Sequence, residues 1–159
     1  MQAAKDTFLR TLSERLTGLN PARTVTLDGG ARAAVLAVEN ETPSAYAERE
    51  TFVVSWESAA LAVPGAGLMY AECKVSYGSQ GSDAMLRTDR GRTVTAMDGE
   101  LLGMCTPRWA AKHDYTQTPP AALGTNVFWT APVLEGLSEA GGVLTRTAKV
   151  RLYFFPEVG

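Results

Sequence analysis

The sequence predicts an α+β domain: an antiparallel or mixed β-sheet with two helices packed on one face, plus a long contact loop. Two segments, residues 3–17 and 89–105, repeat their apolar residues at helical spacing, whereas most other apolar residues alternate with polar ones as in strands. The predicted strands are grouped around the helices, without the βαβ alternation of a doubly wound sheet. A third segment, residues 106–124, fits neither period.

Size and composition limit the possible classes of protein. The 159 residues fit one domain, residues 1–159, and 45% hydrophobic and 20% charged residues are ordinary for a globular protein. No stretch approaches the roughly 18 consecutive apolar residues of a membrane span. The net charge of −2 and the scattered Lys and Arg argue against a nucleic-acid-binding face. We therefore expect neither a membrane nor a sequence-specific nucleic acid as partner.

Each predicted helix has an apolar stripe along one side. The first helix, residues 3–17, is followed by Gly18 and Pro21, which stop it. The stripes consist of Phe8, Leu12 and Leu16 in the first helix, and of Val94, Met97, Leu101, Met104 and Cys105 in the second. We expect both stripes to pack onto a sheet or onto another helix.

The first strands flank a strong turn signal. Residues 24–27 alternate Thr with apolar residues, and residues 34–38 form a second apolar run. The sequence Asp-Gly-Gly at 28–30 between them predicts that the two pair as a hairpin. Residues 39–50 are acidic and polar and predict an exposed connection, which leads to a β-branched and aromatic strand at 51–56.

The later strands are predicted from alternation. Residues 58–69 contain Pro and Gly and predict a bend or loop. Residues 69–77 alternate between a core face and a wetter face. Residues 126–131 and 143–155 predict two more strands, of which the second is the longest in the chain.

Residues 106–124 are too long for an ordinary structureless connection. Ordering them would cost on the order of 20 kcal/mol of backbone entropy, whereas burying one large aromatic side chain returns roughly 5 kcal/mol. Trp109 and Tyr115 therefore cannot hold the segment alone, although three prolines reduce the cost. We expect this loop to pack against a neighbouring subunit or a partner. The candidate interface residues are Trp109, Lys112, His113 and Tyr115.

The chain offers little catalytic or metal-binding chemistry. His113, the only histidine, stands next to Asp114, but no adjacent segment supplies a nucleophile, a metal ligand or a second acid. The acidic run at 39–50 lacks the spacing of a calcium loop, and the glycine-rich turns match no phosphate-binding motif. We expect a structural or binding protein, not an enzyme, with no cofactor and no metal.

Two cysteines and one pair of adjacent aromatic residues could be either buried or functional. Cys73 and Cys105 have no CxxC spacing, which favours buried reduced thiols over a metal or redox site. Phe128 and Trp129 are adjacent on a predicted strand. They are either a binding hot spot or, as we expect, a pair divided between the core and the sheet face.

The order of the predicted elements carries a resemblance to a known family. An opening amphipathic helix, FLRTLSERL, leads into a short hairpin, TVTLDGGARAAVLAVE. A strand, YAECKVSYG, precedes a helix, VTAMDGELLGMC, and the chain closes with the paired strands NVFWTAP and LTRTAKVRLYFF. This order resembles the tail terminator, or tail completion, proteins of tailed phages and related prophage particles. It covers nearly the whole chain as a pattern, without a short diagnostic motif.

The resemblance implies a non-enzymatic virion protein, which forms a ring, usually hexameric, at the end of the tail tube and offers a docking surface to the head. Its partners would be further copies of itself, the tail tube protein and a head-completion or neck protein. The implied location is the tail or neck of the virion, after assembly in the host cytoplasm. The alternatives are another neck or baseplate component, a small-molecule-binding α+β domain that uses His113, or an adaptor that does not self-assemble.

Overall fold

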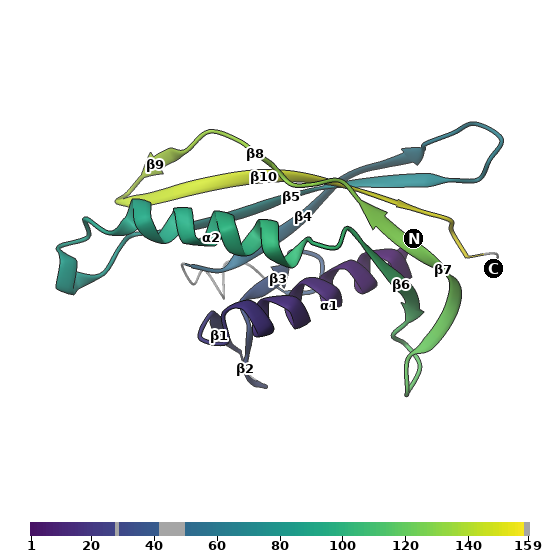
Figure 1. The fold of residues 1–159 in the computed structure, drawn as a ribbon, viewed down its shortest axis with the longest axis horizontal. Helices are drawn as coiled ribbons and strands as arrows, with labels where there is room; N and C mark the ends of the chain where they lie inside the picture. Colours follow the sequence, from purple (N-terminus) through teal and green to yellow (C-terminus); the bar gives the residue numbers. More distant parts are fainter. Residues whose placement is uncertain (28, 42–49, 158–159) are drawn as a thin grey trace.

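The fold is known from a computed structural model, which describes residues 1–27, 29–41 and 50–157. Its elements follow one another in the order helix, strands, helix, strands (Figure 1). They are α1 (Gln2–Leu19), β1 (Thr24–Leu27), β2 (Gly30–Ala33), β3 (Val35–Ala37), β4 (Phe52–Leu61), β5 (Met69–Ser79), a short 3-10 helix (Asp83–Met85), α2 (Arg90–Met104), β6 (Trp109–Asp114), β7 (Ala121–Trp129), β8 (Val133–Leu134), β9 (Ser138–Ala140) and β10 (Val143–Phe154).

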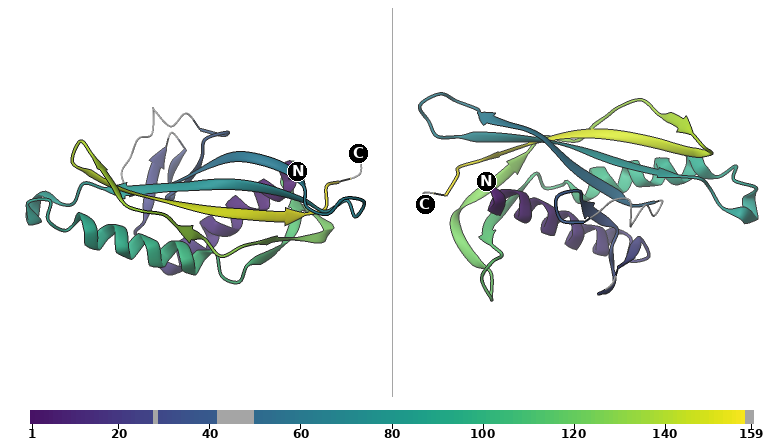
Figure 2. Two further views of the ribbon diagram at one scale, coloured as in Figure 1. Left: turned by 90° about the horizontal axis from the view of Figure 1, so that it is seen from above. Right: turned by 180° about the vertical axis from the view of Figure 1, so that it is seen from behind.

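The main sheet is mixed, as predicted. Its strands lie in the order β3-β4-β5-β10-β7-β6, and only the β3–β4 pair is parallel. On one side, β10 pairs with β5 along nearly the whole length of β10. On its other side, β10 pairs in turn with β9, β8 and β7. β1 and β2 form a separate hairpin. The β4–β5 turn projects from one end of the molecule (Figures 1 and 2).

Both helices lie on one face of the sheet, which confirms the predicted α+β architecture (Figures 1 and 2). Their apolar stripes are fully buried against the inward side chains of β5 and β10 in one hydrophobic core. Alternation leaves the opposite face of β5, β10 and β7 for outward-pointing residues. Among the described elements, no helix covers that face.

The prediction that residues 106–124 form a structureless contact loop is wrong. Most of it forms the β6–β7 hairpin, whose register runs from Trp109 opposite Phe128 to Asp114 opposite Ala121. Cross-strand hydrogen bonds and packing of α1 on β6 supply the stabilisation that two aromatic side chains alone could not. The alternation was hidden because the register shifts within the hairpin and prolines fill its turn.

Two boundaries at the start of the sheet also differ from prediction. β1 pairs with residues 30–33, and the buried run predicted at 34–38 instead contributes β3, parallel to β4. β4 continues to Leu61 through the segment predicted as a bend, after an irregularity between Trp56 and Ser58. Of the predicted acidic connection, residues 42–49 lie outside the described residues.

Two side-chain predictions are confirmed. Cys73 and Cys105 are buried free thiols, and burial raises the pKa of Cys105 to about 12. Trp129 packs in the core, whereas its neighbour Phe128 is exposed on the other side of the strand. In the described part of the chain, no helix is long and apolar enough to cross a membrane.

Candidate protein-interaction surface

A row of aromatic residues crosses the uncovered face of the sheet. Trp109 on β6 lies opposite Phe128 on β7, which lies opposite Tyr153 on β10. Tyr153 lies opposite Tyr70 on β5, and Tyr70 lies opposite Ala60 on β4. The four aromatic residues, from the neighbouring strands β6, β7, β10 and β5, form what we call the aromatic row.

The aromatic row points away from the core because its neighbours along the strands point into it. Trp129, Leu152 and Ala71, each next in sequence to a member of the row, are buried in the core. Trp109 is 48% exposed and Phe128 is 51% exposed. Since large aromatic side chains seldom stay this exposed without a role, we treat the row as a candidate contact surface.

A band of charged pairs runs beside the row on the same face. Arg151 and Glu72 lie opposite each other, with Nη2 and Oε2 2.8 Å apart, and the Arg151 guanidinium lies 4.3 Å from the centre of the Tyr70 ring. Farther along, Lys149 Nζ lies 3.9 Å from Glu57 Oε2. Such exposed pairs add little stability, but they leave the face nearly neutral beside its apolar row.

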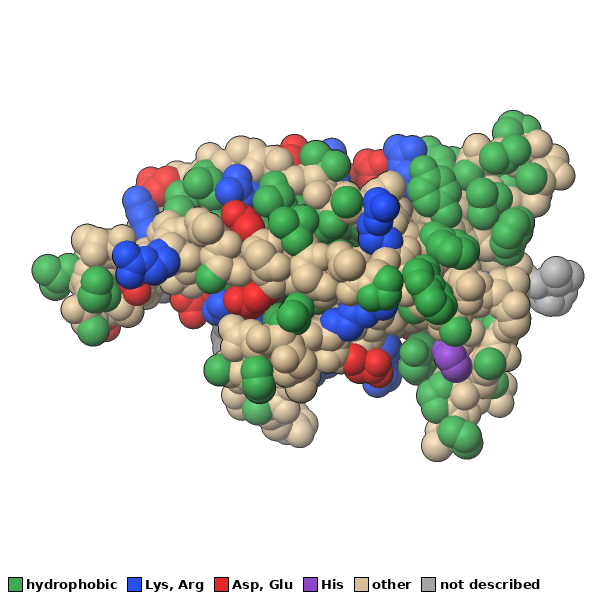
Figure 3. All heavy atoms as spheres, in the orientation of Figure 1, with side chains coloured by type: hydrophobic (Ala, Val, Ile, Leu, Met, Phe, Trp, Pro, Cys, Tyr) green, Lys and Arg blue, Asp and Glu red, His purple; other side chains and the backbone are tan. Residues whose placement is uncertain are grey.

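More apolar side chains extend this surface toward the end of the molecule. Figure 3 shows hydrophobic side chains gathered where the β4–β5 turn and the β6–β7 hairpin lie. Outside the row, Val133 and Phe155 are large exposed apolar side chains, and Val133 lies opposite Lys149 on this face. Leu61 is also exposed but lies opposite Met69, so it belongs to the other face of the projecting turn. Contiguous exposed apolar side chains mark interaction sites on soluble proteins.

Of the predicted interface residues, Trp109 belongs to the aromatic row, but Lys112 does not. The Lys112 side chain is 2% exposed, donates a hydrogen bond to the carbonyl oxygen of Phe155, and lies 2.8 Å from Glu157 Oε1. The N-terminal ammonium also lies 3.1 Å from Glu157. Lys112 therefore binds the C-terminal segment of its own subunit, contrary to its predicted place at an interface.

His113 and Tyr115 are half-buried beside α1 and lie outside the row. The backbone N–H of His113 donates to Thr7 Oγ1 at 3.1 Å, and its ring Nδ1 lies 2.9 Å from the carbonyl oxygen of Ala111. Tyr115 contacts the His113 ring and the guanidinium of Arg10, and burial raises its pKa.

The adjacent Asp114 does not orient the imidazole of His113 as a catalytic base. Its carboxylate accepts hydrogen bonds from the backbone and hydroxyl of Thr116, and the pKa of Asp114 is lowered by the hydroxyl and backbone bonds from Thr116. His113 instead interacts with the backbone of its own strand.

Arg15 on α1 has a role that was not predicted from the sequence. Its guanidinium donates to the carbonyl oxygens of Met104, Pro107 and Trp109, and lies 5.6 Å from the centre of the Trp129 ring. It thereby fixes the connection from α2 into the hairpin that carries Trp109. No motif in the sequence signals this role.

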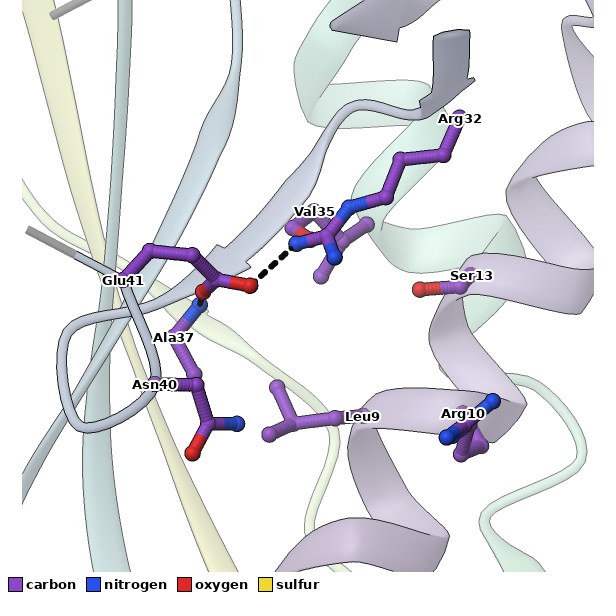
Figure 4. A pocket seen from close by; sticks show the side chains of 8 residues that line it. All are labelled: Leu9, Arg10, Ser13, Arg32, Val35, Ala37, Asn40 and Glu41. Atoms are coloured by element: carbon purple, nitrogen blue, oxygen red, sulfur yellow. Dashed lines mark hydrogen bonds and ion pairs between the residues drawn. The ribbon is translucent and has the colours of Figure 1, made fainter. Parts of the chain in front are cut away.

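A hollow of about 330 Å3 lies between α1 and the β2–β3 region, away from the aromatic row. Figure 4 shows Leu9 and Ser13 pointing into it from α1, across from an ion pair in which Arg32 Nη2 lies 2.5 Å from Glu41 Oε1. Arg10 completes one wall. The hollow can accept a small polar or anionic group, and His113 does not line it.

Within residues 1–27, 29–41 and 50–157, no three His, Cys, Asp or Glu side chains are placed to hold a metal ion together. No model of a known protein family matches the chain. No curated protein matches it significantly in sequence.

Proposed function

We propose that this protein is a structural subunit of a tailed phage or phage-like particle. Its copies assemble into a ring, a hexamer as is usual for tail terminators, which caps the tail tube and provides the docking surface for the head. The observation that carries the proposal is the aromatic row, exposed across a sheet face that no described helix covers. The resemblance in element order to tail terminator proteins is the reason for placing this surface in a phage tail.

The chemistry of the row suits contact between folded proteins. Exposed Trp and Phe supply large contact areas with few rotatable bonds, and Trp and Tyr are the commonest anchors of interfaces. The neighbouring pairs Arg151–Glu72 and Lys149–Glu57 give a neutral polar rim, as interfaces between proteins usually have. A ring subunit needs such a surface to contact its neighbour or the tube.

Removing the two most exposed rings of the row tests the proposal. We expect wild-type protein to form a discrete ring-sized species, and Trp109→Ser combined with Phe128→Ser to weaken assembly at least tenfold, since each anchor contributes about 1–2 kcal/mol or more. Sedimentation velocity across a concentration range measures the mass, and electron microscopy identifies rings. Leu102→Ser, at a 42% exposed leucine on α2, is the matched control.

Two results would contradict the assignment. One is a double variant that assembles as well as wild type, and the other is a Leu102→Ser variant that loses assembly equally. Either would show that the row does not make the contact. A role elsewhere in the neck or baseplate predicts the same dependence on the row without a ring in the micrographs.

The hollow beside α1 favours one other function, a small-molecule-binding domain. It would hold its ligand through Arg10 and Arg32 rather than through His113. Calorimetric titration with inorganic phosphate and with citrate tests this candidate, and binding should weaken in Arg10→Gln. Absence of heat with both anions in the wild-type protein would remove this candidate for small anions.

A further inference from the structure

The outer edge of β4 is open over its second half. β3 pairs with β4 only from Phe52 to Val54, and the backbone N–H of Val38 extends the contact to the carbonyl of Val54. Beyond that point, no described strand pairs with this edge, and residues 57–61 are all exposed. An open edge of this kind is a template for a further strand.

The backbone groups that face outward on this edge can be identified. The N–H of Ala62 donates to Leu68 across the β4–β5 turn, so Ala62 points its backbone groups toward β5, and so does Ala60 two residues earlier. Alternation then directs the N–H and C=O of Ala59 and Leu61 outward. The edge therefore offers two donors and two acceptors at regular spacing.

The side chains on this edge do not prevent pairing. Natural edges are protected by charged residues, prolines or bulges, and here the one bulge lies between Trp56 and Ser58. After it, Ser58–Leu61 pair regularly with β5 and carry no charge. Leu61, 58% exposed, adds an apolar side chain that has no cover within the subunit.

The opposite edge of the sheet, on β6, is partly occupied by side chains of the same subunit. Arg15 donates to the Trp109 carbonyl, the His113 ring interacts with the Ala111 carbonyl, and Thr7 accepts from the His113 N–H. These side chains lie where a further strand would pair, so the second half of β4 is the more open edge of the sheet.

We propose that the open edge of β4 binds the same edge of a second copy in an antiparallel, two-fold pairing centred on Ala60. In this register Ala59 of each copy lies opposite Leu61 of the other. The backbone N–H and C=O groups of both residues face the second copy, so each such pair exchanges two hydrogen bonds. Ala60 faces Ala60 of the second copy at the axis, where strands come closest and a small side chain fits.

Charge and length both fit a second copy as the occupant. A two-fold axis brings identical residues together, and Ala60 carries no charge to repel its equivalent. Glu57 falls opposite Val63 of the second copy, not opposite another acid. The open part of the edge is also long enough, because β4 of one copy ends at Leu61, before it would meet the part of the second copy's β4 that β3 already covers. The aromatic rows of the two copies, which both end at Tyr70 opposite Ala60, become one line.

The contact is smaller than a permanent interface. Stable interfaces bury about 800 Å2 per partner, more than a four-residue edge and the exposed Leu61 and Val63 provide. We therefore expect a reversible dimer whose fraction rises with protein concentration. The inference does not depend on the proposed function, because a head-to-tail ring contact would join two different surfaces.

Disulfide trapping at the axis tests the pairing directly. Facing residues in a non-hydrogen-bonded antiparallel pair have Cα atoms about 4.5 Å apart, within the range of a disulfide. Ala60→Cys with oxidised glutathione should give a covalent dimer at least tenfold faster than Ala66→Cys, at the exposed β4–β5 turn. Ser58→Cys, which this register places away from its own equivalent, should match Ala66→Cys. The native cysteines are buried and do not compete.

A charge swap tests the same axis without oxidation. Ala60→Lys and Ala60→Glu should each have half the mass of wild type at concentrations where wild type pairs through this edge, and mixing the two variants should restore the wild-type mass. Unchanged thermal melting would establish that both variants fold. A wild-type protein that stays monomeric, equal crosslinking of Ala60→Cys and Ala66→Cys, or a dimer unaffected by Ala60→Lys would each overturn the inference.

Discussion

The ammonium of Lys112 stabilises the end of the chain through Glu157. Burial disfavours the charged carboxylate, but hydrogen bonds from Lys112 and the N-terminal ammonium outweigh it and lower the pKa of Glu157 from 4.5 to about 2. A depressed carboxyl pKa contributes stability above the unfolded value and loses it as the pH falls. We predict that this contribution is complete above about pH 5 and is lost as the pH falls through about 2.

Urea unfolding of wild type and of Glu157→Gln measures this contribution. The difference in unfolding free energy should be present at about pH 6 and shrink as the pH falls toward about 2, where the carboxyl is protonated in the unfolded chain and about half protonated in the folded one. An NMR titration of the Glu157 side chain gives the pKa independently. An ordinary value near 4.5 in the folded protein would contradict the contact with Lys112.

Arg15 on α1 also stabilises the fold, through its hydrogen bonds to the connection between α2 and β6. Arg15→Met keeps the packing on Trp129 but removes the donors to three carbonyl oxygens. We predict a loss of about 1–3 kcal/mol in unfolding free energy, as for unsatisfied partly buried groups. Arg10→Met is the matched control, since Arg10 only stacks on Tyr115, and it should cost less than about 1 kcal/mol. Equal losses for the two variants would contradict the role of Arg15.

At the scale of elements, one ion pair fastens α2 to the sheet. Asp98 on α2 is 8% exposed, accepts from the Arg146 side chain on β10 at 2.9 Å, and accepts from the Tyr77 hydroxyl at 2.5 Å. Arg146 also donates to the carbonyl of Glu135, before β9. The pair therefore joins the helix to two strands and to the segment that leads into β9.

Breaking this pair from one side should be more damaging than removing it. We predict that Asp98→Ala and Arg146→Ala each lower the unfolding free energy by roughly 2–4 kcal/mol, because each leaves a buried group without its partner. The double variant should lose clearly less than the sum of the two. Denaturant unfolding of all four proteins measures the coupling, and strict additivity would contradict it.

The elements also show what the sequence could and could not reveal. Both helices and the strands β5 and β10 were predictable because each is long enough for its period to appear, whereas only the first half of β4 and the second half of β7 were predicted. β6 and the first half of β7 were missed because a shifted register and a proline-filled turn hide alternation within a short strand. β3 was given the wrong partner, since a three-residue buried run does not state which neighbour it joins.

The interaction surface depends on information that no local pattern contains. Tyr70, Phe128 and Tyr153 each have the alternation expected of a strand residue. Their alignment in one row follows from the strand order β5-β10-β7-β6 and from the register, both of which are set by long-range pairing. Trp109 was identified only because an exposed-looking aromatic in an irregular segment suggested a contact.

At the scale of the whole molecule, the two proposed contacts have different symmetry. A ring formed through the aromatic row joins one surface to a different one, head to tail, whereas the β4 edges join like to like. Together they would give two rings related by two-fold axes, with identical outer ends. In the proposed tail role, one end of the ring would face the tube and the other the head, so the edge contact would belong to the free protein and would open during assembly.

This difference in symmetry gives the last prediction. Because Ala60→Lys removes only the two-fold contact, it should halve the mass of the largest assembly of the free protein and leave single rings. Trp109→Ser with Phe128→Ser should instead leave dimers, since the β4 edge is intact. Mass photometry of the two variants beside wild type separates the contacts. If both variants give the same species, the row and the edge form one interface, and the two contacts cannot be independent.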